Sequence, residues 1–312
     1  MSNNLFQKDL ITVEHLTKRD VESVFEKARE IKKIVRKKGG NLKLRGKVAG
    51  LLFYEPSSRT FSSFASSMQR LGGGIIPLFS MSFSSTVKGE TIEDTAKVFS
   101  SYADVLIVRH QEANSMSKFA KYASIPVISG GEGAYGEHPT QALIDMFTIK
   151  EKLGRIQGLH ILIIGDLAHY RPTNSLAKLL SVYPKVKLSF ASPKKVSIRK
   201  EVLDYLQERK VNYSLHENYD ALLSRVDVLY VTRVKKEYMS STLYEQIRGS
   251  YSIDKSKIKK MKKKSLVMHC LPRIDEISTE IDNDKRSVYL SDQVRNGLYV
   301  RMALIEMILK KR

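Results

Sequence analysis

Short apolar runs alternate with helical patterns along almost the whole 312-residue chain. The runs are rich in β-branched residues, as is typical of strands that are buried on both faces of a sheet. Their alternation with helices predicts an α/β protein built on parallel sheets. The strand candidates are residues 47–54, 74–79, 103–109, 125–129, 159–165, 186–190, 211–215, 226–232 and 265–269.

Two α/β domains fit this length, since a domain typically has about 100–200 residues. The apolar stripe of residues 138–154 predicts one helix that joins the domains, and a new α/β run begins after it. We predict a first domain over 1–150, a second over 151–290, and a C-terminal helix within 291–312 that packs back on the first.

Polar side chains crowd the junction between the first strand and the helix that follows it. Ser57, Ser58, Arg59 and Thr60 come directly after FYEP. Backbone N–H groups and the dipole at a helix start favour an anion, and an arginine can grip a phosphate through two N–H groups. A serine that simply caps the helix is the alternative for this stretch.

Other predicted strand ends also deliver basic or imidazole side chains. Arg109 ends one strand, His138 follows a glycine-rich loop, and Arg171, Arg233 and His269 follow strands of the second domain. Ligands of open α/β sheets bind beyond the carboxyl ends of the strands. Because no acidic cluster matches these cations, we expect a strongly anionic ligand set.

Several kinds of site are excluded by spacing. The sequence has no metal-ligand spacing, dinucleotide fingerprint, GxxxxGK[ST] phosphate loop or GxSxG nucleophile motif. Cys270, beside His269, is interpreted as a structural cysteine, because neighbouring strand-end residues point to opposite faces. As the single cysteine it excludes an internal disulfide.

With no signal peptide and no apolar run long enough for a membrane, a cytoplasmic protein is expected.

The net charge of +20 raises the question of a polyanionic partner. Much of it lies in two basic runs, residues 32–47 and 255–264, and neither interleaves aromatic residues with the basic ones. We interpret both as solvated faces. Binding to nucleic acid or to a membrane surface is the alternative, and steep salt dependence of nucleic-acid retention would indicate it.

Together the motifs resemble those of the carbamoyltransferases, and within that family the catalytic chains that act on aspartate. The likeness spans about residues 47–309. It rests on FYEPSSRT, VKGETIEDT, ADVLIVRH, GEHPTQALID, IIGDL…R, VLYVTRVKKE, HCLPRIDEIS and NGLYVRMAL, in that order. The resemblance implies two parallel α/β domains with the active site between them. It also implies transfer of a carbamoyl group to aspartate, in pyrimidine biosynthesis, with no metal, no cofactor and no covalent enzyme intermediate.

The resemblance also implies a role for each matching residue. Ser57, Ser58, Arg59 and Thr60 would bind the phosphate of carbamoyl phosphate. Its carbamoyl end would be bound by a second set, consisting of Thr60, Arg109, His138, Gln141 and the carbonyls of Leu271 and Pro272. The residues implied as catalytic are Arg59, Thr60, Arg109 and His138.

Arg171 and Arg233 would take the carboxylates of aspartate, and Lys235, where the family has a glutamine, would join them. Ser84 and Lys88 match a loop lent by the neighbouring subunit. The implied assembly is therefore a homotrimer with shared active sites, to which regulatory chains can bind in this family.

Some positions depart from the family pattern. Ala168, Tyr170 and Pro172 flank Arg171, and Cys270 stands where the aspartate enzymes usually have proline. HCLP is the spelling of the ornithine enzymes, so a carbamoyltransferase for ornithine or a related amine is one alternative. A catalytically impaired homologue that serves as a binding subunit is the other.

Overall fold

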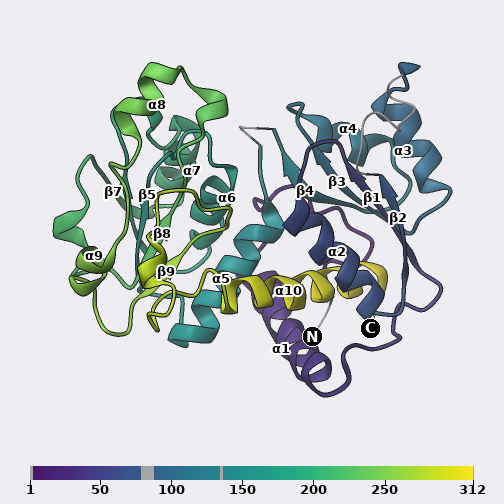
Figure 1. Ribbon diagram of the computed structural model, residues 1–312. Coiled ribbons are helices and arrows are strands. Elements are labelled where there is room, and N and C mark those ends of the chain that lie inside the picture. The colour runs from purple at the N-terminus through teal and green to yellow at the C-terminus, as the bar shows by residue number, and fades with distance from the viewer. Residues whose placement is uncertain (1–2, 79–87, 134–135, 312) are drawn as a thin grey trace. The chain divides into compact units, whose positions relative to one another are not determined.

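The computed structural model describes residues 3–78, 88–133 and 136–311, except for the side chain of residue 237. The chain divides into two compact units (Figure 1). Unit 1 is Met1–Leu143 with Arg295–Arg312, and unit 2 is Ile144–Val294. Helix α5 (Pro139–Leu153) and helix α10 (Asp292–Leu309) each contain one of the points where the chain passes from one unit to the other.

Unit 1 is built on a parallel four-stranded sheet in the order β2-β1-β3-β4. Its central strands are almost wholly apolar and buried, which is why they read as continuous hydrophobic runs. A shift of register between Val108 and His110 interrupts the pairing of β3 with β4. The strands are β1 (Val48–Phe53), β2 (Gly74–Leu78), β3 (Val105–His110) and β4 (Val127–Glu132).

Four further helices belong to unit 1. Helix α2 packs on β1 and β2, whereas α3 and α4 pack together and against β3. Thr17 and Asp20 form a capping box at the start of α1, and Thr91 caps α3. The helices are α1 (Lys18–Lys38), α2 (Ser58–Arg70), α3 (Ile92–Ser100) and α4 (Ser115–Tyr122).

Unit 2 is built on a parallel five-stranded sheet in the order β7-β6-β5-β8-β9. Its core includes Leu162, Ile164, Leu229 and Val231, which lie on the two central strands. The strands are β5 (His160–Ile164), β6 (Lys187–Ala191), β7 (Asn212–His216), β8 (Val228–Val231) and β9 (Leu266–Met268).

Unit 2 has four further α-helices, of five to ten residues. Its α-helices are α6 (Arg171–Leu180), α7 (Lys200–Glu208), α8 (Ser241–Ile247) and α9 (Lys255–Lys259). Short 3₁₀ helices connect them: η3 (Lys194–Val196), η4 (Asp220–Leu222), η5 (Lys236–Tyr238) and η6 (Thr279–Ile281).

The predicted fold class is confirmed, since both sheets are wholly parallel and strands alternate with helices. Each of the nine predicted strands overlaps an observed one. The joining helix of residues 138–154 appears as α5. Within the described part of the chain, no helix combines the length and the apolar character that crossing a membrane requires.

Candidate functional site

Strand order singles out one edge of each sheet. In unit 1 the order changes direction between β1 and β3, and in unit 2 it changes between β5 and β8. Crossover helices leave a sheet on opposite faces at such a switch point, which opens a crevice beyond the carboxyl ends of those two strands. The polar segments that follow these four strands are therefore the first candidates for binding residues.

In unit 1 the switch point joins two predicted segments. Phe53 and Arg109 are register partners at the ends of β1 and β3, and the amide of Tyr54 donates to the carbonyl of Arg109 at 2.8 Å. The turn that leads from β1 into α2 therefore begins beside Arg109. This brings the SSRT motif and Arg109 to the same edge of the sheet.

The start of α2 leaves its polar side chains available. Ser57 occupies the N-cap position, but its side chain makes no capping hydrogen bond. Ser58 and Arg59 are exposed, and Thr60 is buried. The capping interpretation is thus correct in placing Ser57 at the N-cap, but it is wrong in expecting its hydroxyl to accept a capping hydrogen bond. The N–H groups of the first turn favour an anion at this helix start.

Arg109 is half-buried and held by two acceptors. Its Nη2 lies 2.9 Å from a carboxylate oxygen of Glu55, and its Nη1 donates to the carbonyl of Gly130 at 3.1 Å. A guanidinium oriented in this way presents a fixed positive charge at the strand end, although Glu55 offsets part of that charge.

His138 and Gln141 lie at the start of α5, as predicted. His138 is only 5% exposed, and its Nδ1 lies 3.5 Å from the hydroxyl of Thr140. The glycine-rich loop before it is tied to β3, because the amide of Gly133, at φ 41°, donates to the carbonyl of His110 at 2.8 Å. Lys88 is exposed, whereas Ser84 lies outside the described residues.

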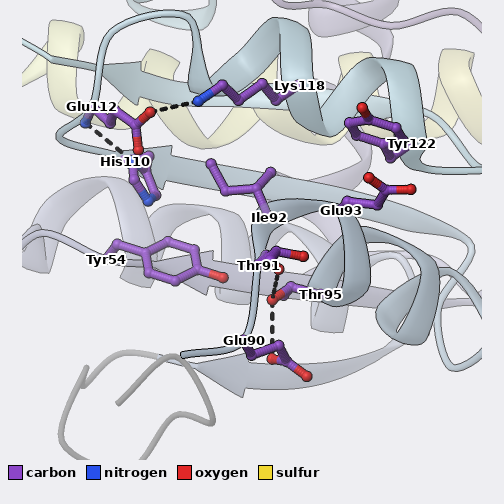
Figure 2. A pocket seen from close by; sticks show the side chains of 10 residues that line it. All are labelled: Tyr54, Glu90, Thr91, Ile92, Glu93, Thr95, His110, Glu112, Lys118 and Tyr122. Carbon is purple, nitrogen blue, oxygen red and sulfur yellow. Dashed lines mark hydrogen bonds and ion pairs between the residues drawn. The ribbon is translucent and has the colours of Figure 1, made fainter. Parts of the chain in front are cut away.

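A pocket of about 420 Å³ lies in unit 1 (Figure 2). None of the predicted site residues that the structure describes is among those that line it. Three glutamates line it, and of these Glu112 pairs with Lys118 at 2.6 Å, so the pocket does not suit an anionic substrate. Its lining is Tyr54, Glu90, Thr91, Ile92, Glu93, Thr95, His110, Glu112, Lys118 and Tyr122.

In unit 2, Arg171 and Arg233 lie at the switch point between β5 and β8. Arg171 is the first residue of α6 and is 5% exposed, and Arg233 is half-buried. Thr232, which precedes Arg233, donates its hydroxyl to the carbonyls of Ile164 at 3.0 Å and Asp166 at 3.1 Å. Thr232 thereby fixes the two strand ends to each other.

A buried carboxylate organises the residues around Arg171. Asp166 accepts from the amide of His169 at 3.1 Å and from the amide of Lys235 at 3.3 Å, and the His169 ring nitrogen lies 3.1 Å away. Neither Asp166 nor His169 is among the site residues predicted from the sequence. An aspartate directly after the β5 glycine was the available signal.

Lys235 is buried between aromatic rings. It is 8% exposed, with its ammonium 4.8 Å from the ring centre of Tyr238 and 5.7 Å from that of Tyr170. Tyr238 stacks on His169, with ring centres 5.6 Å apart. Aromatic faces attract a cation, so these rings favour the placement of Lys235 in the region of Arg171 and Arg233.

The loop after β9 holds three residues of interest. Cys270 is a free, half-buried thiol whose sulfur lies 3.1 Å from the hydroxyl of Tyr170. Burial, and then the neighbouring Cys270, raise the pKa of Tyr170 well above its ordinary value, so this phenol is protonated. Leu271 is half-buried and has φ 59°, and Pro272 is exposed.

Three lysines of the 255–264 run have acidic partners in unit 2. Lys257 and Lys260 both pair with Asp220, and Lys262 pairs with Asp227 at 2.8 Å. These ion pairs give part of the run a structural role in unit 2. Among the described residues, no group of three or more His, Cys, Asp or Glu side chains could hold a metal ion.

Comparison with known proteins identifies two family domains. Residues 8–151 match the family described as "Aspartate/ornithine carbamoyltransferase, carbamoyl-P binding domain". Residues 157–308 match "Aspartate/ornithine carbamoyltransferase, Asp/Orn binding domain". The two matches together cover almost the whole chain.

Individual relatives agree with these matches. The multifunctional protein pyr1-3 of Dictyostelium discoideum is 41% identical over 98% of this chain, which spans 14% of that larger protein. The aspartate carbamoyltransferase catalytic subunit of Methanobrevibacter smithii is 40% identical over 97% of this chain and 95% of its own length. The crystal structure of aspartate transcarbamoylase from Trypanosoma cruzi with carbamoyl phosphate and aspartate superposes on this chain with a TM-score of 0.93. The two sequences are 33% identical, and the match covers 99% of this chain and 97% of that one.

Proposed function

The chain belongs to the aspartate/ornithine carbamoyltransferase family, and we propose that it transfers the carbamoyl group of carbamoyl phosphate to L-aspartate. The products are N-carbamoyl-L-aspartate and phosphate, so the reaction belongs to pyrimidine biosynthesis. The observation that carries the proposal is the set of cationic side chains beyond the strands of both switch points, namely Arg59, Arg109, Arg171, Arg233 and Lys235. Two polyanionic substrates need such a set.

The start of α2 binds the phosphate in this proposal. Ser57 and Ser58 offer hydroxyls, Arg59 offers a two-pronged donor, and the first-turn amides complete the cradle. Thr60, the next residue, is buried. In this proposal its hydroxyl contacts both the phosphate and the carbamoyl end of the substrate.

The carbamoyl end is activated by hydrogen-bond donors. Arg109, His138 and Thr60 address the carbonyl oxygen, and Gln141 together with the main-chain carbonyls of Leu271 and Pro272 holds the amino group. The neutral amine of aspartate attacks the carbonyl carbon and forms the new N–C bond, while negative charge grows on the oxygen. The C–O bond to phosphate then breaks, and the departing phosphate takes the amine proton. Such catalysis rests on positioning and charge stabilisation.

Aspartate is held by the cations of unit 2. In this proposal Arg171 and Arg233 bind its two carboxylates. Lys235, whose ammonium lies over the ring of Tyr170 near Arg171, also binds a carboxylate. The buried position of Arg171 favours a strong charge-assisted bond, because water competes little there.

A homotrimer completes the proposal. Ser84 and Lys88 would come from the neighbouring subunit, which accounts for the exposure of Lys88 in the single chain. We infer a cytoplasmic location from the one free cysteine, Cys270, which suits a reducing compartment.

The ornithine alternative rests on one observation, the HCLP spelling with the Cys270 thiol at 3.1 Å from Tyr170. Lys235 argues against it, because a second amine on the substrate would meet a buried ammonium group. The impaired-homologue alternative rests on the changes at Ala168, Tyr170 and Pro172.

The test uses purified chain with carbamoyl phosphate and with aspartate or ornithine in parallel, and it measures carbamoylated product. Arg59→Ala, purified in the same way, should lose activity, which excludes a contaminating host enzyme as the source. Arg45→Ala, at an exposed arginine, is the control that should keep activity. Product from aspartate alone supports the proposal, and product from ornithine alone supports the alternative. No product from either amine would favour the binding-subunit reading. A phosphonate analogue of the two joined substrates should bind tightly if both sets of residues are intact.

A further inference from the structure

The loop from His269 to Glu276, which follows β9, closes on itself through side chains. The amide of Leu271 donates to Nδ1 of His269 at 2.7 Å. The other ring nitrogen, Nε2, lies 2.8 Å from Oε1 of Glu276. The second carboxylate oxygen accepts from the amides of Ile274 at 3.0 Å and Asp275 at 3.1 Å. Two side chains thus take up three amide donors of one short loop.

The hydrogen bonds fix the protonation of His269. Because Nδ1 accepts an amide proton, the ring carries its own proton on Nε2, which lies beside the carboxylate of Glu276 at 2.8 Å. His269 is 1% exposed and Glu276 is 4% exposed, so water competes with neither contact. Buried polar groups of this kind are costly unless each is paired, and here they are paired with each other and with the loop backbone.

The backbone inside the loop is strained. Leu271 has φ 59°, a left-handed conformation that a branched apolar residue seldom adopts. Such conformations persist where surrounding contacts over-determine them, and they gather at functional sites. The amide of Leu271 is held by its bond to His269, while its side chain packs on the core of unit 2 and its carbonyl oxygen lies 3.9 Å from the sulfur of Cys270.

His269 is itself anchored from the other side. Its amide donates to Oε1 of Gln293 at 3.1 Å, and Nε2 of Gln293 donates to Asp145 at 2.7 Å. Tyr230 donates to the second oxygen of Asp145 at 2.9 Å. Hydrogen bonds thus link the loop to β8, to the middle of α5 and to the start of α10.

We propose that His269 and Glu276 are positioning residues that hold the 271–272 backbone in the one conformation whose carbonyls can accept the amino group of the carbamoyl moiety. This inference rests on the proposed function. It adds that the 271–272 backbone is arranged by these two side chains to recognise the carbamoyl group. The amide donors of the loop are turned inward to the two side chains, and its carbonyls serve as the acceptors. Neither residue touches the substrate.

The test separates the two ends of carbamoyl phosphate. Phosphonoacetamide carries a phosphonate and an amide NH2, whereas inorganic phosphate lacks the amide, so their equilibrium binding is compared by calorimetry on the full chain. Glu276→Gln and His269→Gln should weaken phosphonoacetamide binding by about tenfold or more, the cost of a charge-assisted hydrogen bond that is lost or misplaced. Binding of inorganic phosphate should change less than about twofold, since it depends on the start of α2.

A conservative variant and a neighbour serve as controls. In His269→Asn the amide oxygen can replace Nδ1 as the acceptor for Leu271, so it should bind phosphonoacetamide better than His269→Gln does. Asp275→Asn removes an exposed carboxylate of the same loop, which pairs with Arg248 at 2.9 Å, and it should leave binding unchanged. If the His269 variants do not fold, Glu276→Gln carries the test alone.

The outcomes are distinct. Equal loss of phosphonoacetamide and phosphate binding, or unaltered phosphonoacetamide binding in Glu276→Gln, would overturn the inference. Failure of the unaltered chain to convert carbamoyl phosphate and aspartate would instead overturn the proposed function, whatever the variants do.

Discussion

Arg109 and Glu55 form a 2.9 Å ion pair at the carboxyl ends of β3 and β1, where the strand order of unit 1 changes direction. Both side chains are largely buried, at 13% and 17% exposed. The carboxylate orients the guanidinium, which in the proposed mechanism would be shared between Glu55 and the substrate carbonyl. In that proposal Glu55 holds a catalytic cation in place.

Replacing Arg109 tests this arrangement. Arg109→Ala should lower kcat by about 10²–10³, the cost of losing one donor to a developing oxyanion. Arg109→Lys keeps the charge but not the planar fork, so it should recover only part of the rate. Steady-state kinetics provide the measurement, with Arg45→Ala, an exposed arginine of the same unit, as control. Near-normal turnover in both Arg59→Ala and Arg109→Ala would contradict the assignment of the site.

Lys235 should contribute to the binding of aspartate. Lys235→Gln restores the amide that the family resemblance predicts at this position, and we expect it to raise KM for aspartate by about tenfold, since it exchanges a charged donor for a neutral one. KM for carbamoyl phosphate should stay the same. Lys236→Gln, at the exposed neighbouring position, is the control. An unchanged KM for aspartate in Lys235→Gln would remove Lys235 from the aspartate site.

Glu306 should stabilise unit 1 through a shared ion pair. Its carboxylate lies 2.6 Å from Lys27 and 2.9 Å from Lys43, and its side chain is 4% exposed. Glu306→Gln should lower the free energy of unfolding by about 2 kcal/mol, less than the ~3–5 kcal/mol of a fully buried pair, because both lysines keep contact with water. Urea denaturation measures it. The exposed Glu30→Gln should cost below about 0.5 kcal/mol, and equal effects of the two variants would count against a special role for Glu306.

Asp282 should make stability depend on pH. Its carboxylate accepts from Arg273, with one contact at 2.7 Å, and from Tyr289 at 2.5 Å. The hydrogen bond from Arg273 holds the pKa of Asp282 below its ordinary 3.8. A lowered folded-state pKa means that the stabilisation is present above 3.8 and is lost as pH falls through the folded value.

Asp282→Asn should therefore lower the free energy of unfolding at pH 7 by about 1–2 kcal/mol, since a quarter of the side chain is still exposed. The difference from the unaltered chain should shrink as the pH falls below 3.8 towards the lowered folded-state pKa. Urea titrations at pH 7, 5 and 3 would measure it. A difference that stays constant over this range would exclude Asp282 as the source of the pH dependence.

The strands, and the places of several proposed site residues in the fold, could be predicted from the sequence because their signals are local. Runs such as 159–165 and 226–232 are apolar throughout since both faces of a parallel strand are buried, and each appears as a strand. Arg109, His138, Arg171 and Arg233 follow their strands or start their helices as expected, because a strand end and a helix start are themselves local features.

Other properties depend on contacts between distant residues and left no local signal. The sequence does not specify which strands are neighbours. The switch points at β1/β3 and β5/β8 therefore follow only from the strand order in the folded sheets. Ser57 looked like a capping residue, and only the turn geometry decided that its hydroxyl does not cap.

By itself, then, the sequence determined the α/β class, the order of the elements and the residue types at the strand ends, because burial and backbone propensity act over a few neighbouring residues. The tertiary structure decided which of those ends lie together and how they are held. The pairing of His269 with Glu276, and of Asp145 with Gln293, forms only when buried polar groups from separate elements must satisfy one another.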